Sequence, residues 1–467
     1  MSSDSRNKRL RPLIAVAGLL WAFSPAAAQE EEGFPGVSLG LLYESAYVPT
    51  VAVKPFTGRM GGASVASPAG AIVARDLRYS DRFEILDSIP ASLVGEGVDY
   101  RLWDQIGADW VITGEVEGVG DEFILTLQLH DIIDGAPRER ARIPLPDVDS
   151  PGFRMAVHTA SDLVVRWITG EPGMAASRIA FSRQVVNRDG EVTKELYLVD
   201  SDGENLRRIT SSGSISLSPA WSPDGTKLLY NSFKSGVPAI YEMDLATRSE
   251  RTLEVGRGGQ FMTPTYHPNG REVVFSILDG RRSGLFSYDL SRGCCLAHLS
   301  GGRWNDQSPS FSADGSRIAF ESNRLGDAVP QIYVMDSQGG EADLISPYAY
   351  GRGGYYTSPD WSPTGDRVAF HGRIRSGRYH ILVADVAARG RRVIQLTTEG
   401  NNEDPSWAPD GRHIVFVGER DWGFGLFAVD AVTGRLRLIV GGIRASVPEW
   451  SSTLREAPLD GLPGGGR

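Results

Sequence analysis

Histidine, serine and cysteine carry most of the nucleophilic and metal-binding chemistry of proteins, and none of them occurs here in a spacing typical of a site. The seven histidines are scattered singly, at positions 130, 158, 267, 298, 371, 380 and 413. The chain has no Gly-x-Ser-x-Gly nucleophile elbow, no His-Glu-x-x-His zinc motif, no Walker loop and no Cys-x-x-Cys pair. The sequence therefore predicts no catalytic residue, no metal site and no cofactor.

The two cysteines of the chain, Cys294 and Cys295, are neighbours. Consecutive Cα atoms lie about 3.8 Å apart, which is less than the usual separation across a disulfide. The pair can form the rare bridge between adjacent residues or remain as two thiols, and the sequence leaves both alternatives open.

Aspartates recur in Pro-Asp-Gly turns, where they could bind calcium but are also the residues that such turns favour. These turns belong to a signature of the type Ser-Pro-x-Trp-Ser-Pro-Asp-Gly that recurs through the second half of the chain. Its aromatic residue recurs every 43 to 50 residues, at positions 221, 266, 311, 361, 407 and 450. A fixed period of this length is typical of arrays and propellers, so we interpret the aromatic residues as packing between repeats.

Each repeat has the pattern of four short antiparallel strands. The Asp-Gly turn leads into a β-branched and aromatic strand such as Arg317 to Phe320, and a second hairpin follows, as at Ile332 to Asp336. Four strands in about 45 residues make a propeller blade. The unit that starts at Arg178 lacks its first strand, and Pro448 to Trp450 supply one from the other end. We therefore predict a closed, all-β, six-bladed propeller over residues 178–452.

Residues 1–28 are organised like an export signal, with a basic start, an apolar stretch from Leu13 to Phe23 and a small-residue cleavage site. They carry four basic residues and one acidic residue, so their removal changes the net charge from −10 to −13. Such an acidic chain argues against a nucleic-acid partner. The apolar stretch is too short to span a bilayer, and we expect no direct membrane insertion.

Residues 49–168 predict a small α/β domain with a mixed sheet. Strands are expected at residues 49–56, 83–87, 110–116 and 123–129, and helices from Ser67, around residues 100–106, and from Asp149. The last helix carries an apolar stripe, which we interpret as core: Phe153, Val157, Ala160, Val164 and Trp167. The remaining segments are predicted to be a flexible N-terminal segment (29–48), a linker (169–177) and a disordered tail (453–467). For the N-terminal segment the alternative of a strand awaiting a partner stays open.

Without catalytic chemistry, the propeller is best interpreted as a binding surface. The chain enters each innermost strand from one face, so the segments before the signature prolines should ring the mouth of the channel. We expect these segments to be loops, and they contain the aromatic and Met residues that anchor interfaces. These segments differ from one repeat to the next. The alternative, that they differ only because loop sequences vary freely, stays open. The candidate binding residues are Gln260, Phe261, Met262, Thr263, Trp304, Asp306, Gln307, Tyr355, Tyr356, Asn402, Glu403 and Arg444.

The chain resembles the TolB family of the Tol-Pal cell-envelope system, over nearly all of its predicted mature length. The propeller repeats alone are not specific, but the N-terminal half and the junction are. The matching stretches are Ala69–Arg78, Phe83–Asp87, Gly107–Glu115, Ala156–Asp162 and Thr169–Gly173 followed by Arg178–Phe181.

The resemblance implies a non-enzymatic adaptor, a monomer in the periplasm, that supports outer-membrane integrity and envelope constriction in cell division. It implies binding of the lipoprotein Pal at the propeller mouth, at positions that carry over to Gln260, Thr263 and Gln307. It also implies binding of TolA by the N-terminal segment, where the candidate contacts are Val37, Leu39, Leu41 and Tyr43. The alternative is a periplasmic propeller enzyme, or a glycan- or peptide-binding module, with its site in the channel.

Overall fold

The structure is a computed structural model that describes residues 37–39, 47–120, 122–186, 190–326, 329–348, 354–373, 377–390 and 392–454. The predicted signal peptide lies outside the described residues, as do Leu41, Tyr43 and residues 455–467 of the predicted tail.

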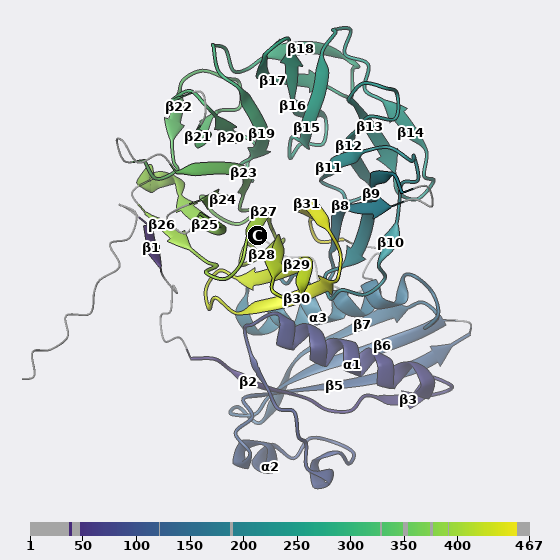
Figure 1. Ribbon diagram of the computed structural model, residues 1–467. Helices are drawn as coiled ribbons and strands as arrows, with labels where there is room; N and C mark the ends of the chain where they lie inside the picture. The colour runs from purple at the N-terminus through teal and green to yellow at the C-terminus, as the bar shows by residue number, and fades with distance from the viewer. Residues whose placement is uncertain are drawn as a thin grey trace, which may run out of the picture. The chain divides into compact units, whose positions relative to one another are not determined.

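The N-terminal region is an α/β domain with one mixed sheet (Figure 1). Its elements are β2 (Thr50–Val53), β3 (Thr57–Arg59), α1 (Ala63–Tyr79), β4 (Glu84–Ile85), η1 (Ala91–Leu93), α2 (Tyr100–Gln105), β5 (Trp110–Val119), β6 (Glu122–Asp131), β7 (Ala136–Leu145) and α3 (Phe153–Thr169). The sheet order is β4-β2-β5-β6-β7, with β3 also beside β5. β2, β3 and β4 pair in parallel with their neighbours, whereas β5, β6 and β7 are antiparallel.

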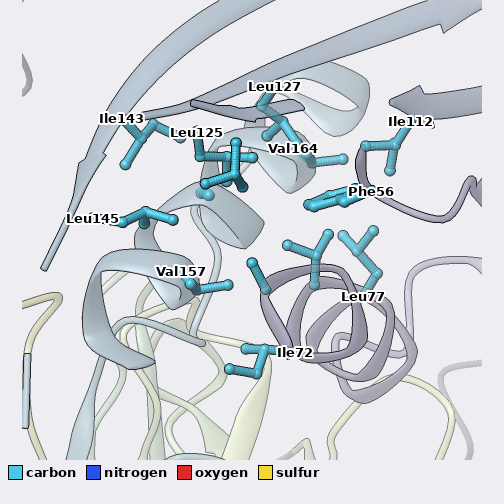
Figure 2. Close-up of a cluster of buried hydrophobic side chains, with 14 of the residues drawn as sticks. Phe56, Ile72, Leu77, Ile112, Leu125, Leu127, Ile143, Leu145, Val157 and Val164 are labelled. Atoms are coloured by element: carbon cyan, nitrogen blue, oxygen red, sulfur yellow. The ribbon is translucent and has the colours of Figure 1, made fainter. Parts of the chain in front are cut away.

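The main core of this domain lies between the sheet and the helices α1 and α3 (Figure 2). Alternation along β6 points Leu125, Leu127 and Leu129 into it, as the sequence predicts. The predicted stripe of α3 also packs there, with Val157 and Val164 fully buried. The other face of the sheet is covered by α2, whose Trp103 is fully buried in a smaller cluster.

Two elements of the domain differ from the prediction. α1 begins at Ala63, so Pro68 lies inside the helix rather than at its start. The φ of proline is helical, but the residue removes one backbone hydrogen bond and its ring crowds the carbonyl four residues earlier. The strand β7 was not predicted, since Arg138, Glu139 and Arg140 interrupt any apolar pattern. Charged residues and prolines of this kind are typical of a sheet edge, which is where β7 lies.

The second part of the chain is a six-bladed propeller, as predicted (Figure 1). Its blades are β11 (Ser216–Trp221), β12 (Lys227–Ser232), β13 (Ala239–Asp244) and β14 (Glu250–Thr252); β15 (Gln260–Tyr266), β16 (Glu272–Asp279), β17 (Arg282–Asp289) and β18 (Cys294–His298); β19 (Asp306–Phe311), β20 (Arg317–Ser322), β21 (Gln331–Asp336) and β22 (Ala342–Leu344); β23 (Tyr355–Trp361), β24 (Arg367–Arg373), β25 (Tyr379–Asp385) and β26 (Val393–Gln395); β27 (Asn402–Trp407), β28 (His413–Arg420), β29 (Gly423–Asp430) and β30 (Leu436–Gly441); and β31 (Ala445–Trp450), β8 (Arg178–Val186), β9 (Val192–Asp200) and β10 (Arg207–Arg208). We number them blades 1 to 6 in this order. A short 3-10 helix, η2 (Val386–Ala388), precedes β26.

The ring closes in blade 6, where the last strand, β31, pairs with β8 near the start of the propeller. Trp450 of β31 is buried, and its Nε1 donates a hydrogen bond to Ser177 Oγ at 2.7 Å. Closure removes the two exposed edges that an open array of blades would leave. The predicted way of joining the two ends is confirmed.

Blade 4 has a fifth strand, β1 (Val37–Leu39), which pairs in parallel with β26. These residues belong to the segment 29–48, for which the sequence leaves open a flexible course or a strand awaiting a partner. At the other end, the structure differs from the expectation at Leu454, which the sequence places in a disordered tail. Leu454 is buried against Met155 and Ala176, because its apolar side chain closes a gap beside α3.

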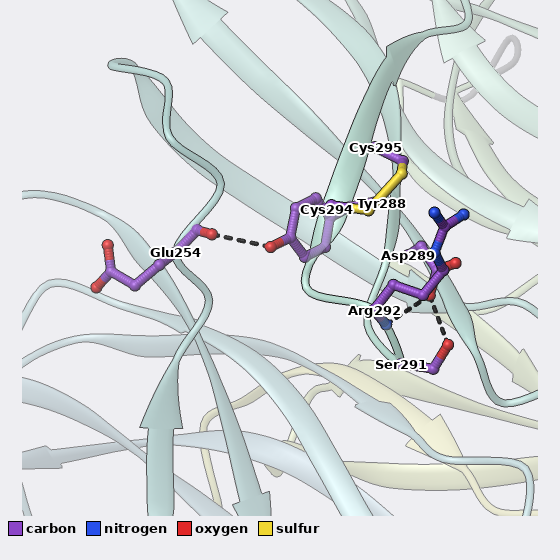
Figure 3. The surroundings of a disulfide bond; sticks show 7 residues. All are labelled: Glu254, Tyr288, Asp289, Ser291, Arg292, Cys294 and Cys295. Atoms are coloured by element: carbon purple, nitrogen blue, oxygen red, sulfur yellow. Dashed lines mark hydrogen bonds between the residues drawn. A yellow bond between two sulfur atoms is a disulfide. The ribbon is translucent and has the colours of Figure 1, made fainter.

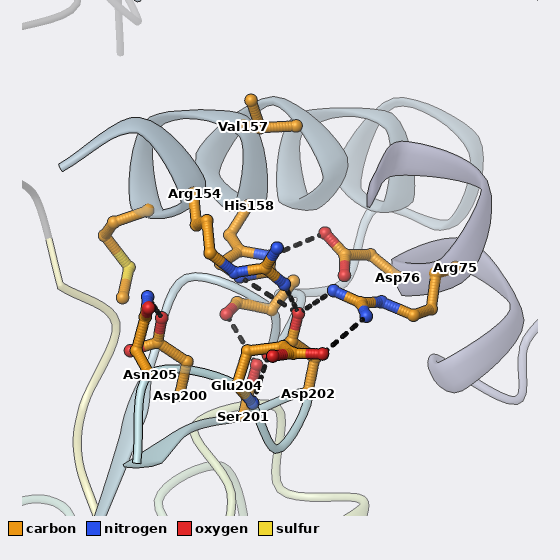
Figure 4. Close-up of polar contacts among 12 residues, drawn as sticks. Arg75, Asp76, Arg154, Val157, His158, Asp200, Ser201, Asp202, Glu204 and Asn205 are labelled. Atoms are coloured by element: carbon orange, nitrogen blue, oxygen red, sulfur yellow. Dashed lines mark hydrogen bonds and ion pairs between the residues drawn. The ribbon is translucent and has the colours of Figure 1, made fainter. Parts of the chain in front are cut away.

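Asp202, in the turn between β9 and β10, joins the propeller to the α/β domain (Figure 4). Its carboxylate makes ion pairs with Arg75 of α1 and Arg154 of α3, and lies 3.5 Å from Nε2 of His158. The Asp202 side chain is 1% exposed. Burial acts to raise the pKa of Asp202, but His158 and the two arginines outweigh it and lower the pKa.

A second contact has the opposite arrangement, with an acid of the α/β domain held by propeller residues. Asp81, just after α1, lies 3.0 Å from Nη1 of Arg435 and 3.3 Å from Nε2 of His413. The Asp81 carbonyl oxygen accepts a hydrogen bond from Arg412 at 2.7 Å. Each domain therefore inserts one carboxylate among cationic side chains of the other, and we call these contacts the Asp202 clamp and the Asp81 clamp.

The segment between the domains is held by Asp162 of α3. Its two carboxylate oxygens accept hydrogen bonds from the backbone N–H groups of Ala175 and Ala176, both at 2.9 Å. Burial raises the pKa of Asp162 to about 7, although these hydrogen bonds oppose the shift. The interdomain segment therefore has a fixed course into β8.

No helix in the described part of the chain is long and apolar enough to cross a membrane.

Candidate functional site: the propeller mouth and channel

From the sequence, the segments before the signature prolines are expected to be loops. Most of their residues instead form the first halves of the six innermost strands, and Trp304 and Arg444 lie just before β19 and β31. Gln260 to Thr263, for example, lie within β15, and Tyr355 to Ser358 lie within β23. Every one of these strands has a register shift just before its proline. A bulge of this kind keeps the strand paired while breaking its apolar alternation, and for that reason the pattern resembles a loop.

The residue directly before each signature proline has a left-handed backbone. The φ values lie between 45° and 54°, at Ser218, Thr263, Ser308, Ser358, Asp404 and Val447. Non-glycine residues seldom adopt this conformation, and for the β-branched Val447 it is strained. These six residues and the prolines that follow them line a cavity of about 110 Å³ on the axis of the propeller. The repeated Pro therefore marks a ring of bulges around the channel.

The bulges turn backbone N–H groups toward neighbouring blades, where side chains accept their hydrogen bonds. Ser308 N donates to Thr263 Oγ1 at 3.2 Å, and Val447 N donates to Asp404 Oδ2 at 2.9 Å. Such bonds satisfy donors that the irregular ladder leaves unpaired. These two bonds also tie β15 to β19 and β27 to β31 across the boundaries between blades.

The channel contains acidic side chains that the sequence did not place there. Asp360 accepts hydrogen bonds from Ser310 Oγ at 3.0 Å and from Trp407 N at 2.7 Å, which are on the two neighbouring blades. Burial raises the pKa of Asp360 to about 6. Burial and the nearby Asp360 also raise the pKa of Glu449. The hydrogen bonds of Asp360 hold blades together.

His371, Thr357 and Asp404 lie together at the channel but are not arranged as a nucleophile and its base. His371 Nδ1 accepts a hydrogen bond from the backbone N–H of Asp404 at 3.0 Å, so its proton lies on Nε2. Nε2 therefore donates to Thr357 Oγ1, 2.8 Å away, and cannot take the proton of that hydroxyl. Burial lowers the pKa of His371, which keeps the ring neutral.

Among the residues that the structure describes, two groups of acids and histidine have ligand atoms close enough to hold a cation: Asp76, His158 and Asp202; and Asp81, His413 and Asp430. Both groups belong to the interdomain clamps rather than to the channel. Arg75 and Arg154 pair with Asp202, and Arg412 pairs with Asp430. These arginines already pair with the carboxylates, and their positive charges would repel a bound cation.

Four of the predicted mouth residues lie three positions before a signature proline. Three of them, Asp306, Tyr356 and Asn402, are buried, whereas Phe261 is only partly buried. The sequence places these three among the candidate binding residues without indicating this burial, which arises because alternate side chains of a strand point into the packing between blades. Asp306 accepts a hydrogen bond from Arg324, and Asn402 accepts one from Arg420.

The other predicted residues are at least partly exposed: Gln260, Phe261, Met262, Thr263, Trp304, Gln307, Tyr355, Glu403 and Arg444. The structure brings some of them together. Glu403 and Arg444 line one hollow of about 210 Å³ between blades 5 and 6. Trp304 lines another of about 170 Å³ between blades 2 and 3.

The mouth face also has a ring of exposed apolar side chains that sequence reasoning missed. Strand register places the end of β12 beside the start of β11, and that of β28 beside the start of β27. The hairpin tips that follow β8, β12, β20 and β28 therefore lie on the mouth face. They expose Val186, Val192, Phe233, Val237, Leu325 and Trp422. No periodic signal identifies them, because Phe233, Val237, Leu325 and Trp422 lie in turns and Val186 and Val192 lie where β8 ends and β9 begins.

Models of two protein families match the chain. The TolB amino-terminal domain matches residues 45–137, and the TolB beta propeller domain matches residues 165–454. The second match alone covers more than half of the sequence. The chain belongs to the TolB family.

Relatives and solved structures agree with this assignment. The Tol-Pal system protein TolB of Anaeromyxobacter dehalogenans strain 2CP-1 is 31% identical over 59% of this chain, and that of Polaromonas sp. strain JS666 is 33% identical over 55%. The alignments span 62% and 55% of those proteins. The crystal structure of TolB from Acinetobacter baumannii is 25% identical, with a TM-score of 0.73, and the match covers 87% of this chain and 97% of that one.

For this TolB-family chain, the predicted N-terminal contacts are described only in part. The backbone of Val37 and Leu39 lies in β1, beside β26 on the outer edge of blade 4. Leu41 and Tyr43 lie outside the described residues. The described part of this segment, β1, and the mouth candidates therefore belong to separate parts of the propeller surface.

Proposed function

We propose that this chain is the TolB component of a Tol-Pal system. In this proposal it is a non-enzymatic periplasmic adaptor that binds the lipoprotein Pal through the propeller mouth and TolA through its N-terminal segment. Through these partners it supports outer-membrane integrity and envelope constriction during cell division. Family membership and the Tol-Pal names of its relatives support the proposal.

The single observation that carries the Pal assignment is the chemistry of the mouth face. It combines exposed apolar tips such as Trp422, which is 60% exposed, with partly buried aromatic residues such as Phe261 and Trp304. A rim of apolar side chains around hydrogen-bonding strand starts is typical of a protein interface. The clamps that hold the α/β domain lie at the opposite ends of the strands, at the turns around Asp202 and His413, so the mouth is free of that domain.

The test is the affinity of the purified chain for the soluble domain of Pal, measured by calorimetry. Truncation of Phe261 and Trp304 to alanine should weaken binding at least tenfold, because buried aromatic residues carry most interface energy. The matched control is Ile133→Ala, which truncates a 79% exposed residue of the α/β domain and should leave the affinity unchanged. Equal affinities for the double variant and the control would reject the mouth as the Pal site.

The TolA assignment rests on the N-terminal segment, whose described part, β1, is a three-residue strand on the edge of blade 4. Three residues in a parallel edge pairing make few backbone bonds, so β1 can be displaced at small cost. We propose that the segment is docked or free according to whether the mouth is filled. Deletion of residues 29–43 should abolish TolA binding while Pal binding is retained. Equal TolA affinities with and without saturating Pal would rule out the coupling.

The alternative function, a propeller enzyme with its site in the channel, makes a different prediction for Asp360. An enzyme that used this carboxyl would lose activity in Asp360→Asn. In the adaptor proposal the same change weakens the hydrogen bonds to Ser310 and Trp407 and acts through stability. The Pal affinity of the folded Asp360→Asn variant separates the two functions, because the adaptor proposal expects that affinity to be retained.

A further inference from the structure

Cys294 and Cys295 begin β18, the outermost strand of blade 2, and a disulfide joins them (Figure 3). The register of β17 and β18 changes here, so that two residues of β18, Cys295 and Leu296, face only Tyr288 of β17. Cys295 has a φ of 69°, a left-handed value that is uncommon for any residue but glycine. The disulfide therefore lies in a bulge at the start of an edge strand.

This disulfide contributes little to holding the fold. A disulfide stabilises a protein mainly by closing a loop in the unfolded chain, and the effect grows with the number of residues enclosed. Between neighbours the closed loop is the smallest possible. The packing of this blade comes instead from buried residues such as Phe275, Phe286 and Tyr288.

The turn and the bulge are fixed by other bonds (Figure 3). Asp289 Oδ1 accepts hydrogen bonds from Ser291 Oγ at 2.6 Å and from Arg292 N at 3.0 Å, which set the turn between β17 and β18. Tyr288, opposite the bulge, donates its hydroxyl hydrogen to the carbonyl oxygen of Glu254 at 3.0 Å. These bonds do not depend on the sulfur atoms, so breaking the disulfide leaves them in place.

The sulfur of Cys295 is open to attack. Cys295 is an exposed residue, Cys294 is half-buried, and in the described chain β18 has β17 as its one strand neighbour. We propose that Cys294 and Cys295 form a thiol–disulfide exchange site, which an external dithiol reduces while the propeller stays folded. The site needs no metal or cofactor and is independent of the mouth and of the clamps.

The exchange balances in two steps. A thiolate of the dithiol attacks Sγ of Cys295, and the bond between the two Sγ atoms breaks. Cys294 leaves as a thiolate that takes a proton. The second thiol of the dithiol, as its thiolate, then attacks the mixed disulfide and releases Cys295 as a second thiolate, which also takes a proton. The protein gains two electrons and two protons, and the dithiol becomes a disulfide.

The test uses the full chain purified from the periplasm, labelled with N-ethylmaleimide and weighed by mass spectrometry. We expect no label before reduction, and two labels after dithiothreitol in native buffer, with an unchanged near-ultraviolet circular dichroism spectrum. Two labels without reductant would overturn the proposal. So would labelling that requires denaturant, or reduction that abolishes the near-ultraviolet spectrum.

Variants separate an exchange site from a structural bridge. The double variant Cys294→Ser/Cys295→Ser should melt within about 2 °C of the unmodified chain, because the change lies at a surface strand. In Cys294→Ser the remaining Cys295 should be labelled faster than the half-buried Cys294 that remains in Cys295→Ser. A large fall in melting temperature of the double variant would identify a structural bridge, and labelling of Cys294 as fast as Cys295 would refute attack at Cys295.

Discussion

Replacement of Asp202 by asparagine tests whether buried charge joins the two domains. Asparagine keeps the shape of the side chain but removes the charge that faces Arg75, Arg154 and His158. The Asp202 side chain is 1% exposed and that of His158 is 0% exposed, so these charges have little water to replace the lost partner. The change removes a buried counterion from all three groups; His158 keeps its contact with Asp76 and Arg75 keeps its pair with Glu204. Removing one partner is the costly way of breaking a buried ion pair.

The expected cost follows from burial. Removing one partner of a fully buried pair costs about 3–5 kcal/mol. Arg75 and Arg154 keep 27% and 23% of their side chains exposed, so part of their hydration remains and we expect the lower end, about 3 kcal/mol. The free energy of unfolding should fall by this amount in urea titrations followed by far-ultraviolet circular dichroism.

A neighbouring acid gives the matched control. Glu204 also pairs with Arg75, at 3.6 Å, but its side chain is 57% exposed. Glu204→Gln should therefore change the free energy of unfolding by less than about 0.5 kcal/mol. If Asp202→Asn were no more destabilising than Glu204→Gln, the clamp would not be a significant source of interdomain stability.

Two further changes test the Asp81 clamp and the closure of the ring. Burial acts to lower the pKa of His413, but Asp410 and Asp81 outweigh it and raise the pKa to about 9. Because this pKa lies above the ordinary value, protonation of His413 stabilises the fold fully below pH 6.5. This stabilisation is lost as the pH rises through about 9. The free energy of unfolding should fall between pH 6.5 and pH 9.5, and His413→Gln should reduce this slope; equal slopes would contradict the assignment. Trp450→Ala should cost about 3–5 kcal/mol because it empties a buried site where the ring closes, whereas Trp422→Ala, at an exposed tip, should change stability by less than about 0.5 kcal/mol. A small effect of Trp450→Ala in urea titrations would show that closure does not depend on this residue.

The architecture of the propeller was predictable because its blades are local. The strands of blade 3, from β19 to β22, pair with their neighbours in sequence, so turns and alternation within about 45 residues specify them. Even the long-range pairing of β31 with β8 was predictable, since one end of the propeller lacked a strand and the other had one to spare.

The mouth was located by its prolines but its details were not. The bulge before each proline breaks the alternation, so Asp306 and Asn402 gave no sign of being buried. β7 was missed for a related reason, because an edge strand with a charged outer face has no apolar period.

The sequence by itself determined the number of blades, their closure, the mixed sheet of the α/β domain and the family, because these follow from short-range patterns that repeat or match. Only the tertiary structure decided which residues meet across the chain. Asp202 joins Arg75 across 127 positions, and Asp81 meets His413 across 332. It also resolved the state of Cys294 and Cys295 in favour of the disulfide. Such contacts leave no periodic trace, since they depend on how the α/β domain packs against the propeller rather than on the local pairing that each strand requires.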